Sequence, residues 1–268
     1  MGIEPTSLGK NIRLRRLVDP SGFMLTVPMD HGITLGPVKG LNNIKQTVNA
    51  VFNGGASTVI VQKGMVRTIY DKIPHGKSFM VHVSGSTSRS PTPNLKILTG
   101  SVSSTLKLGA DGISCHVNIG TDYDSSMLSD LNYIIEEADD YNLPVLAMMY
   151  ARDNDGQDSL DVDSLAHIAR IAEEIGSDLV KINATENGLG FDEVSQGISI
   201  PIIVAGGAVT SDFNQFLNTI KQCILDGASG VSIGRNVFQS EDPKLAMKKV
   251  YDAVLSLTKE VDHVQPLH

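Results

Sequence analysis

A lysine inside an apolar segment is the first residue with a capacity for chemistry. Lys181 lies in residues 179–182, where its neighbours are apolar and typical of a strand. Because side chains alternate along a strand, Lys181 and Asn183 should face inward while Val180 and Ile182 face the other side. Full burial can lower a lysine pKa by ~3 to 5 units, and a neutral amine is a nucleophile. The other interpretation is a strand-end lysine that reaches solvent or pairs with an acid.

Two further residues could move protons beside such an amine. Tyr150 ends the apolar run 145–150, and Asp30 follows the apolar run 25–29. A phenol can exchange protons with a bound substrate, and a carboxylate can act as a base or stabilise an iminium. The tyrosine could equally be a packed ring with a solvated hydroxyl, and the aspartate a helix N-cap. His31, next to Asp30, is either a ligand or a satisfied polar residue.

Two glycine-containing pairs predict an anion site. Gly206 and Gly207 follow one apolar run, and Gly234 and Arg235 follow the next. Glycine amides and helix N-termini at such strand ends accept phosphate oxygens, and Arg235 adds a bidentate donor. Each pair alone is equally typical of a turn, but two pairs at neighbouring strand ends favour phosphate binding.

Two alternatives to lysine chemistry stay open on the residues alone. His31, His82 and His116 fall at or near the ends of three apolar runs and could hold Zn²⁺ for a metal-dependent aldolase, although their spacing is no ligand motif. A non-catalytic phosphosugar-binding module is the other alternative. It would leave Lys181 and Tyr150 without a role.

Composition limits the class of partner and the compartment. The formal charge of −8 argues against nucleic acid or an acidic membrane as the main partner, because both require a positive face. Cys115 and Cys223 show no redox or metal spacing, so we expect core thiols and a reducing cytosol. Residues 1–5 do not resemble a signal region, and no uncharged apolar run is long enough to span a bilayer. The sequence predicts a cytoplasmic protein.

Strand-like and helix-like segments alternate along the chain. Helical spacing of apolar residues recurs around residues 44–52, 131–138 and 165–172. The short runs rich in Val and Ile, which suit parallel strands covered on both faces, number eight. They span residues 23–28, 58–62, 79–83, 112–116, 145–149, 179–182, 202–205 and 230–233.

Eight such units can close into a barrel or spread into a doubly wound sheet. The chain of 268 residues has no composition break, and polar or glycine-rich residues follow the strands repeatedly. Closure would bring all of these residues to the catalytic rim of a barrel. Glycines before the strands, such as Gly176 and Gly227, are typical of helix C-caps. We therefore predict an α/β fold with a single (β/α)8 TIM barrel domain over residues 1–268.

Six motifs carry a family resemblance. The chain resembles the archaeal-type class I aldolases from about residue 8 to the final helix, with the motifs in the family's order and approximate spacing. The motifs are VPMDHG at 27–32, HVNIG at 116–120, AMMY at 147–150, VK at 180–181, VAGG at 204–207 and GRNVFQ at 234–239.

The resemblance implies roles for particular residues. Lys181 would form the Schiff base, Tyr150 would donate a proton, and Asp30 would be the acid-base partner. The family uses no metal or organic cofactor and forms homo-oligomers, including decamers. The residues implied in contact with a phosphorylated keto-sugar substrate are His31, Gly32, Ile33, Thr34, Ala151, Arg152, Gly206, Gly207, Gly234 and Arg235.

One departure from the family bears on the acceptor. After Lys181 the sequence reads Ile182, Asn183, Ala184, where relatives commonly have a threonine and then an aromatic residue. Members cleave sugar phosphates, transfer a three-carbon unit to aspartate semialdehyde, build an aminohydroxybenzoate precursor from dihydroxyacetone phosphate, or act as a phospho-diketone thiolase. The overall resemblance favours aspartate semialdehyde as acceptor, with space beside the imine at Ala184. Fructose-bisphosphate cleavage is the main alternative.

Overall fold

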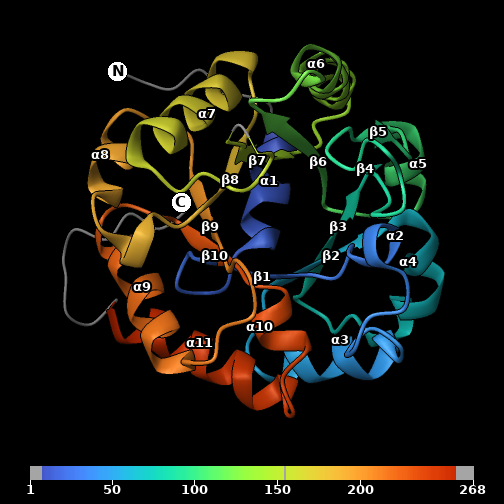
Figure 1. The fold of residues 1–268 in the computed structure, drawn as a ribbon. Coiled ribbons are helices and arrows are strands. Elements are labelled where there is room, and N and C mark those ends of the chain that lie inside the picture. The colour runs from blue at the N-terminus through green and yellow to red at the C-terminus, as the bar shows by residue number, and fades with distance from the viewer. Residues whose placement is uncertain (1–7, 154, 258–268) are drawn as a thin grey trace.

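A closed ring of eight parallel strands forms the centre of the protein (Figure 1). The computed structural model describes residues 8–153 and 155–257. Going round the ring, the order is β1, β10, β9, β8, β7, β6, β3 and β2. The strands are β1 (Met24–Pro28), β2 (Thr58–Gln62), β3 (Ser78–His82), β6 (Gly112–Ile119), β7 (Val145–Ala151), β8 (Leu179–Asn183), β9 (Ile202–Ala205) and β10 (Gly230–Ser232).

The predicted barrel is therefore confirmed, with each of the eight predicted runs in a strand. β8 is one residue longer than predicted, and β6 and β7 extend further because they pair with each other beyond His116 and Met149. Asn118 pairs with Tyr150, and Ile119 pairs with Ala151. This extension carries polar residues of both strands up to the carboxyl-end rim, where the active sites of such barrels lie.

Helices surround the ring and cover its outer face (Figure 1). Most of them connect one strand to the next, as a right-handed parallel topology requires. The helices are α1 (Leu8–Leu17), α2 (Gly32–Leu35), α3 (Ile44–Asn53), α4 (Lys63–Ile69), η1 (Tyr70–Lys72), α5 (Val102–Lys107), α6 (Asp124–Asp140), α7 (Val162–Ile175), η2 (Glu186–Gly188), α8 (Phe191–Gln196), α9 (Phe213–Leu225), α10 (Arg235–Phe238) and α11 (Pro243–Leu257).

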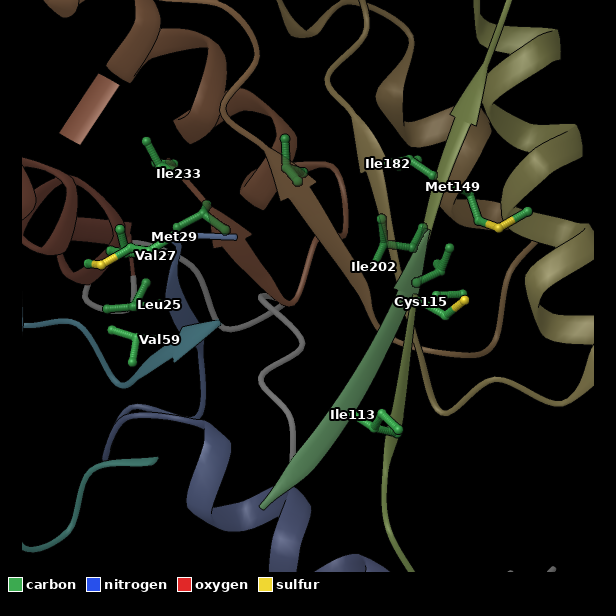
Figure 2. Close-up of a cluster of buried hydrophobic side chains, with 14 of the residues drawn as sticks. Leu25, Val27, Met29, Val59, Ile113, Cys115, Met149, Ile182, Ile202 and Ile233 are labelled. Atoms are coloured by element: carbon green, nitrogen blue, oxygen red, sulfur yellow. The ribbon is translucent and has the colours of Figure 1, made fainter. Parts of the chain in front are cut away.

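The main core lies between the strands and these helices. The predicted helical stripes are confirmed, because Ile44, Val48, Val51 and Phe52 are buried on α3, and α6 and α7 bury their apolar faces in the same way. Figure 2 shows the outward-facing strand residues of this layer, from Leu25 on β1 to Ile233 after β10. Burial of this apolar layer is the main stabilising contribution to the barrel.

A second, smaller apolar cluster fills the barrel interior towards the amino-terminal ends of the strands. It includes the inward-facing Met24, Ile60, Met148 and Leu179, together with Leu17 from α1. The carbonyl of Leu17 accepts hydrogen bonds from the hydroxyls of Ser57 (2.6 Å) and Thr58 (2.7 Å). Helix α1 therefore closes the amino-terminal end of the barrel, so that substrate access is restricted to the carboxyl-end rim.

Short strands and helices lie at the carboxyl-end rim. After β3 the chain forms a two-stranded antiparallel hairpin of β4 (Ser84–Gly85) and β5 (Ile97–Leu98). The short helices α2 and α10 directly follow β1 and β10. These connections supply the side chains of the candidate site.

Two other expectations from the sequence are confirmed. Gly176 ends α7 in the left-handed conformation (φ 101°), and Gly227 precedes β10 with φ 112°. Cys115 and Cys223 are free and buried, and burial raises the pKa of each thiol to about 12. No helix among the described residues has the length and apolarity needed to cross a membrane.

Candidate active site

Lys181 is buried inside the barrel near the carboxyl end of β8. The residue is 5% exposed, and its Nζ lies 4.0 Å from Sδ of Met148, its register partner on β7. Val180 and Ile182 belong to the outer core, as the alternation along the strand predicted. An apolar floor therefore lies beneath the amine, and a cavity of about 240 Å³ opens above it.

Tyr150 lies beside this lysine on β7. Its ring centroid is 5.8 Å from Nζ of Lys181 and 5.4 Å from Cζ of Arg152. The ring of His116 stacks against it at 4.4 Å between centroids, with 18° between the planes. This stacking restricts the phenol to a position next to the amine, where it can deliver or remove a proton.

Asp30 lies where two imidazoles and the lysine converge on one carboxylate. Its Oδ1 is 3.6 Å from Nδ1 of His31, and its Oδ2 is 3.7 Å from Nε2 of His82. Burial alone would raise the pKa of Asp30, but the electrostatic influence of His82, His31 and Lys181 outweighs it and lowers the pKa to about 2. The carboxylate is therefore ionised at neutral pH.

The histidines around this carboxylate are held by hydrogen bonds to other polar groups. His82 Nδ1 lies 2.9 Å from Ser114 Oγ, and His116 Nε2 lies 2.9 Å from Asn118 Oδ1. Burial is the largest cause that lowers the pKa of both rings, and nearby lysines lower it further, while the charge of Asp30 opposes this at His82. The cavity therefore disfavours the protonated form of both imidazoles.

The described part of the chain contains no set of side chains arranged to bind a metal ion. There, no three His, Cys, Asp or Glu side chains are arranged as metal ligands. His31, His82 and His116 all line the cavity, but two of them use ring nitrogens in the bonds just described.

The glycine pairs form one loop structure at the ends of β9 and β10. Nδ2 of the buried Asn236 donates to the carbonyls of Gly206 and Ala208, each at 2.8 Å. Arg235 donates from Nη2 to the carbonyl of Gly207 at 3.0 Å. A Cβ at Gly207 would meet no atom within 4 Å, whereas one at Gly234 would come within 3.0 Å of His31. Hydrogen bonds from Asn236 and Arg235 therefore fix the loop, and Gly207 leaves open space beside it.

Two cations, Arg152 and Lys96, complete the cavity away from the glycine loop, and Asp158 lies between them and the loop because it lines both spaces. Arg152 donates from Nε to Asn118 Oδ1 at 2.8 Å and forms an ion pair with Asp158. Lys96, from the residue before β5, lines the same cavity as Lys181. Burial and the charge of Arg152 lower the pKa of Lys96 to about 8.

Most of the predicted site residues come together at this cavity or at the small space that adjoins it. They are Asp30, His31, Ile33, Thr34, Tyr150, Arg152, Lys181, Gly206, Gly207, Gly234 and Arg235.

Two predicted contact residues are elsewhere. Gly32 lines a neighbouring, mostly apolar cavity, and the Ala151 side chain is packed in the outer core. The reason is alternation, since Ala151 follows the inward-facing Tyr150. Ala184 is also displaced from its expected place beside the imine, because it lines a groove on the far side of Asn183.

Sequence reasoning missed Lys96, Asp158 and Ser232 as cavity residues. Lys96 and Asp158 lie in long rim connections, where alternation gives no direction for a side chain. Ser232 could have been found, because it is two residues before Gly234 on the inward face of β10.

Comparison with known proteins agrees with this geometry. The sequence profile of the DeoC/LacD family aldolases matches residues 24–240. The chain belongs to this aldolase family. Its expected membership of an aldolase family is thereby confirmed.

Several family relatives match nearly the whole chain. A Halobacterium salinarum protein named 2-amino-3,7-dideoxy-D-threo-hept-6-ulosonate synthase is 37% identical over 250 residues, which cover 93% of this chain and 92% of the relative. A Streptomyces griseus protein named 2-amino-4,5-dihydroxy-6-oxo-7-(phosphonooxy)heptanoate synthase is 34% identical over 247 residues, which cover 91% of this chain and 90% of the relative. An archaeal fructose 1,6-bisphosphate aldolase structure has a TM-score of 0.83 at 23% identity, covering 92% of this chain and 99% of that one. This structural likeness shows the shared barrel fold.

Proposed function

We propose that this aldolase forms a Schiff base between Lys181 and a phosphorylated ketone and then joins the donor to aspartate semialdehyde. The observation that carries the proposal is the burial of Lys181 (5% exposed) beside Tyr150 and the ionised Asp30. The amine is positioned as a nucleophile next to a proton donor, and the apolar floor excludes water from the imine.

The names of the relatives support the choice of substrates. The product named for the Streptomyces griseus relative is a heptanoate with an amino group on carbon 2, a ketone on carbon 6 and a phosphate on carbon 7. Such a product divides into a four-carbon amino-acid aldehyde and a three-carbon keto-phosphate. The ketone next to the phosphate is the group that a lysine amine would attack.

The chemistry assigns a task to each residue. The Lys181 amine adds to the donor ketone, and loss of water gives an iminium, which draws electrons from the adjacent carbon. The Asp30 carboxylate accepts a proton from that carbon, or accepts the hydroxyl proton as the next carbon-carbon bond breaks, and either step leaves an enamine. The enamine carbon bonds to the acceptor aldehyde, whose oxygen takes a proton from Tyr150. The carboxylate of Asp30 stabilises the positive iminium, and hydrolysis regenerates the amine.

The glycine loop and Arg235 would hold the donor phosphate. Remote binding of the phosphate positions the ketone carbon over Lys181 and converts binding energy into orientation. The hydrogen bonds of Asn236 keep the loop in its conformation before substrate arrives.

The decisive experiment is reductive trapping. With borohydride and dihydroxyacetone phosphate, fructose 1,6-bisphosphate or a deoxy-diulose phosphate, mass spectrometry should find one adduct, on the peptide that contains Lys181. Lys181→Ala should lose the adduct and lose turnover by about 10⁵-fold or more, the scale of a positioned nucleophile. Lys107→Ala, an exposed lysine on α5, is the matched control. An adduct on another lysine would overturn the proposal.

Product analysis and chelation test the remaining parts. Each donor is supplied with and without aspartate semialdehyde, and the products are identified by mass. A seven-carbon amino acid should form only when both substrates are present. Activity should survive exhaustive chelation, because the iminium replaces a Lewis acid. Loss with EDTA and recovery with Zn²⁺ would instead assign His31, His82 and His116 as ligands.

Assembly and location stay predictions. We propose a homo-oligomer, as in the relatives that the sequence resembles, with a decamer among the possible states. Light scattering of the purified protein at several concentrations measures the subunit number. Residence in the cytoplasm is part of the same proposal.

A further inference from the structure

The two sides of Lys181 differ in what they offer a substrate. Round the ring, β9 and β10 lie on one side of β8, and β7, β6 and β3 lie on the other (Figure 1). The first side carries the glycine loop and Arg235. The second side carries Lys96 and Arg152, and Asp158 pairs with Arg152 but also lines the space at the glycine loop, so it lies between the two sides.

The Lys96 ammonium is positioned by hydrogen bonds and has no ion-pair partner among the described residues. Its Nζ donates to Ser86 Oγ at 2.6 Å and to the carbonyl of Pro93 at 3.1 Å. Among the described residues, no carboxylate forms an ion pair with it. An ammonium has three donors, so one remains for a ligand. The pKa of Lys96 is lowered by its burial and then by Arg152, as expected for two like charges that face one cavity.

Arg152 and Asp158 form a polar pair at the same place. Arg152 is held by Asn118 Oδ1 on β6, and its Nη1 pairs with Oδ1 of Asp158. The Arg152 side chain is 15% exposed and that of Asp158 is 44% exposed, so the carboxylate keeps an oxygen open to the cavity. Two cations and one anion therefore converge on one end of the site.

We propose that Lys96, Arg152 and Asp158 bind the α-amino acid head group of the acceptor aldehyde. Lys96 and Arg152 bind the carboxylate, and Asp158 binds the ammonium. This inference rests on the proposed function, because it assigns the acceptor end of the same reaction.

Charge favours an amino acid over a second phosphate at this end. A carboxylate with an adjacent ammonium matches two cations and one anion, whereas a phosphate dianion would face the carboxylate of Asp158. The direction also fits, since a product with its ketone over Lys181 and its phosphate at the glycine loop extends its amino-acid end towards β7 and β6. A site that bonds polar groups of its substrate discriminates against analogues that lack them.

The test measures selectivity among aldehydes after the donor imine has formed. The acceptors are aspartate semialdehyde, succinate semialdehyde, which lacks the amino group, propanal, which lacks both charges, and glyceraldehyde 3-phosphate. In Lys96→Met, the ratio of kcat/KM for either semialdehyde to that for propanal should fall about tenfold or more. Lys96→Arg should restore part of this ratio. Lys107→Met on α5 is the matched control.

Asp158→Asn separates the two halves of the head group. It should lower the preference for aspartate semialdehyde over succinate semialdehyde about tenfold, because the two differ only in the ammonium. The same variant should improve relative use of glyceraldehyde 3-phosphate, because a repulsive charge is removed. Equal loss with both semialdehydes would show that Asp158 acts only through Arg152 and would overturn its assignment.

The two proposals fail in different ways. If borohydride traps no adduct on Lys181 in the wild-type protein, the proposed function is wrong. If the adduct forms but Lys96→Met affects all four aldehydes equally, or none, the amino-acid site is wrong while the Schiff base stands.

Discussion

The two flanks of Lys181 would bind the proposed ligands with different parts of the chain. On the β9–β10 flank the candidate groups are the backbone of Gly207 and Gly234 together with Arg235, and the buried Asn236 holds the loop by donating to the carbonyls of Gly206 and Ala208. On the β3–β6–β7 flank, side chains such as Lys96 and Arg152 face the cavity.

A backbone site depends on conformation, so few substitutions can change its ligand without disrupting the loop. A side-chain site can change its ligand through single substitutions.

Substitution of Asp30, which lies between the two flanks, should give the largest loss of activity. Asp30→Asn keeps the shape of the carboxylate but removes the charge that stabilises the iminium. We expect kcat to fall by about 10² to 10⁴-fold with every acceptor, the range of a lost acid-base group. Rapid-quench measurement of imine and product should show slow formation of both. A loss restricted to one acceptor would place Asp30 on a single flank instead.

The sequence predicted the barrel and the inward direction of Lys181 for a physical reason. Strands buried on both faces are nearly continuous apolar runs, and the period of two then fixes which residues face inward. The same rule assigns Tyr150 to the cavity and excludes Ala151 from it. Strand residues of the site are therefore predictable one by one.

Residues in long rim connections were not predictable in this way. Lys96 reaches the cavity because the β4–β5 hairpin folds back, and Asp158 because it pairs with Arg152 across a short bridge. The position of Lys96 depends on the pairing of two short strands, and that of Asp158 depends on contacts within an irregular loop. No local pattern of residue types reports such contacts.

Removal of one guanidinium tests the donor flank. Arg235→Ala should weaken binding of phosphorylated donors by about 1.5 to 3 kcal/mol, the scale of a charge-assisted hydrogen bond. The KM for aldehyde acceptors should change much less, because the glycine loop lies on the other side of Lys181. Arg67→Ala, an exposed arginine on α4, is the control. Unchanged donor affinity would mean that the phosphate binds elsewhere on the rim.

Acid should destabilise the protein through the cavity histidines and Asp30. Burial lowers the pKa of His31, His82 and His116, so the unfolded chain binds more protons than the native one once the pH falls below about 6.5. The free energy of unfolding should therefore fall as the pH is lowered from 7.5 to 5. Below pH 4 the lowered pKa of Asp30, about 2, gives a further loss of about 2 kcal/mol, because stability present above the unfolded pKa disappears as the pH falls.

Urea unfolding at several pH values measures this slope. His31→Gln should reduce the slope between pH 7 and 5, because one buried imidazole no longer resists protonation. His167→Gln, at an exposed position on α7, should leave it unchanged. Equal slopes in both variants would contradict the assignment of acid sensitivity to the cavity histidines.

The smallest effect concerns the departure from the family after Lys181. The sequence suggested that Ala184 leaves space beside the imine, in which case Ala184→Tyr would impair use of the acceptor. The structure assigns Ala184 to a groove of about 450 Å³ that includes Thr185 and Phe216, while Asn183 faces both this groove and the space around Lys181. A tyrosine at position 184 can occupy the groove, so we expect less than about a threefold change in acceptor use. Asn183→Ala should cost about 1 kcal/mol, or about fivefold in kcat/KM, because its amide faces the space around Lys181. A larger effect from Ala184→Tyr than from Asn183→Ala would restore the original interpretation and extend the acceptor site into the groove.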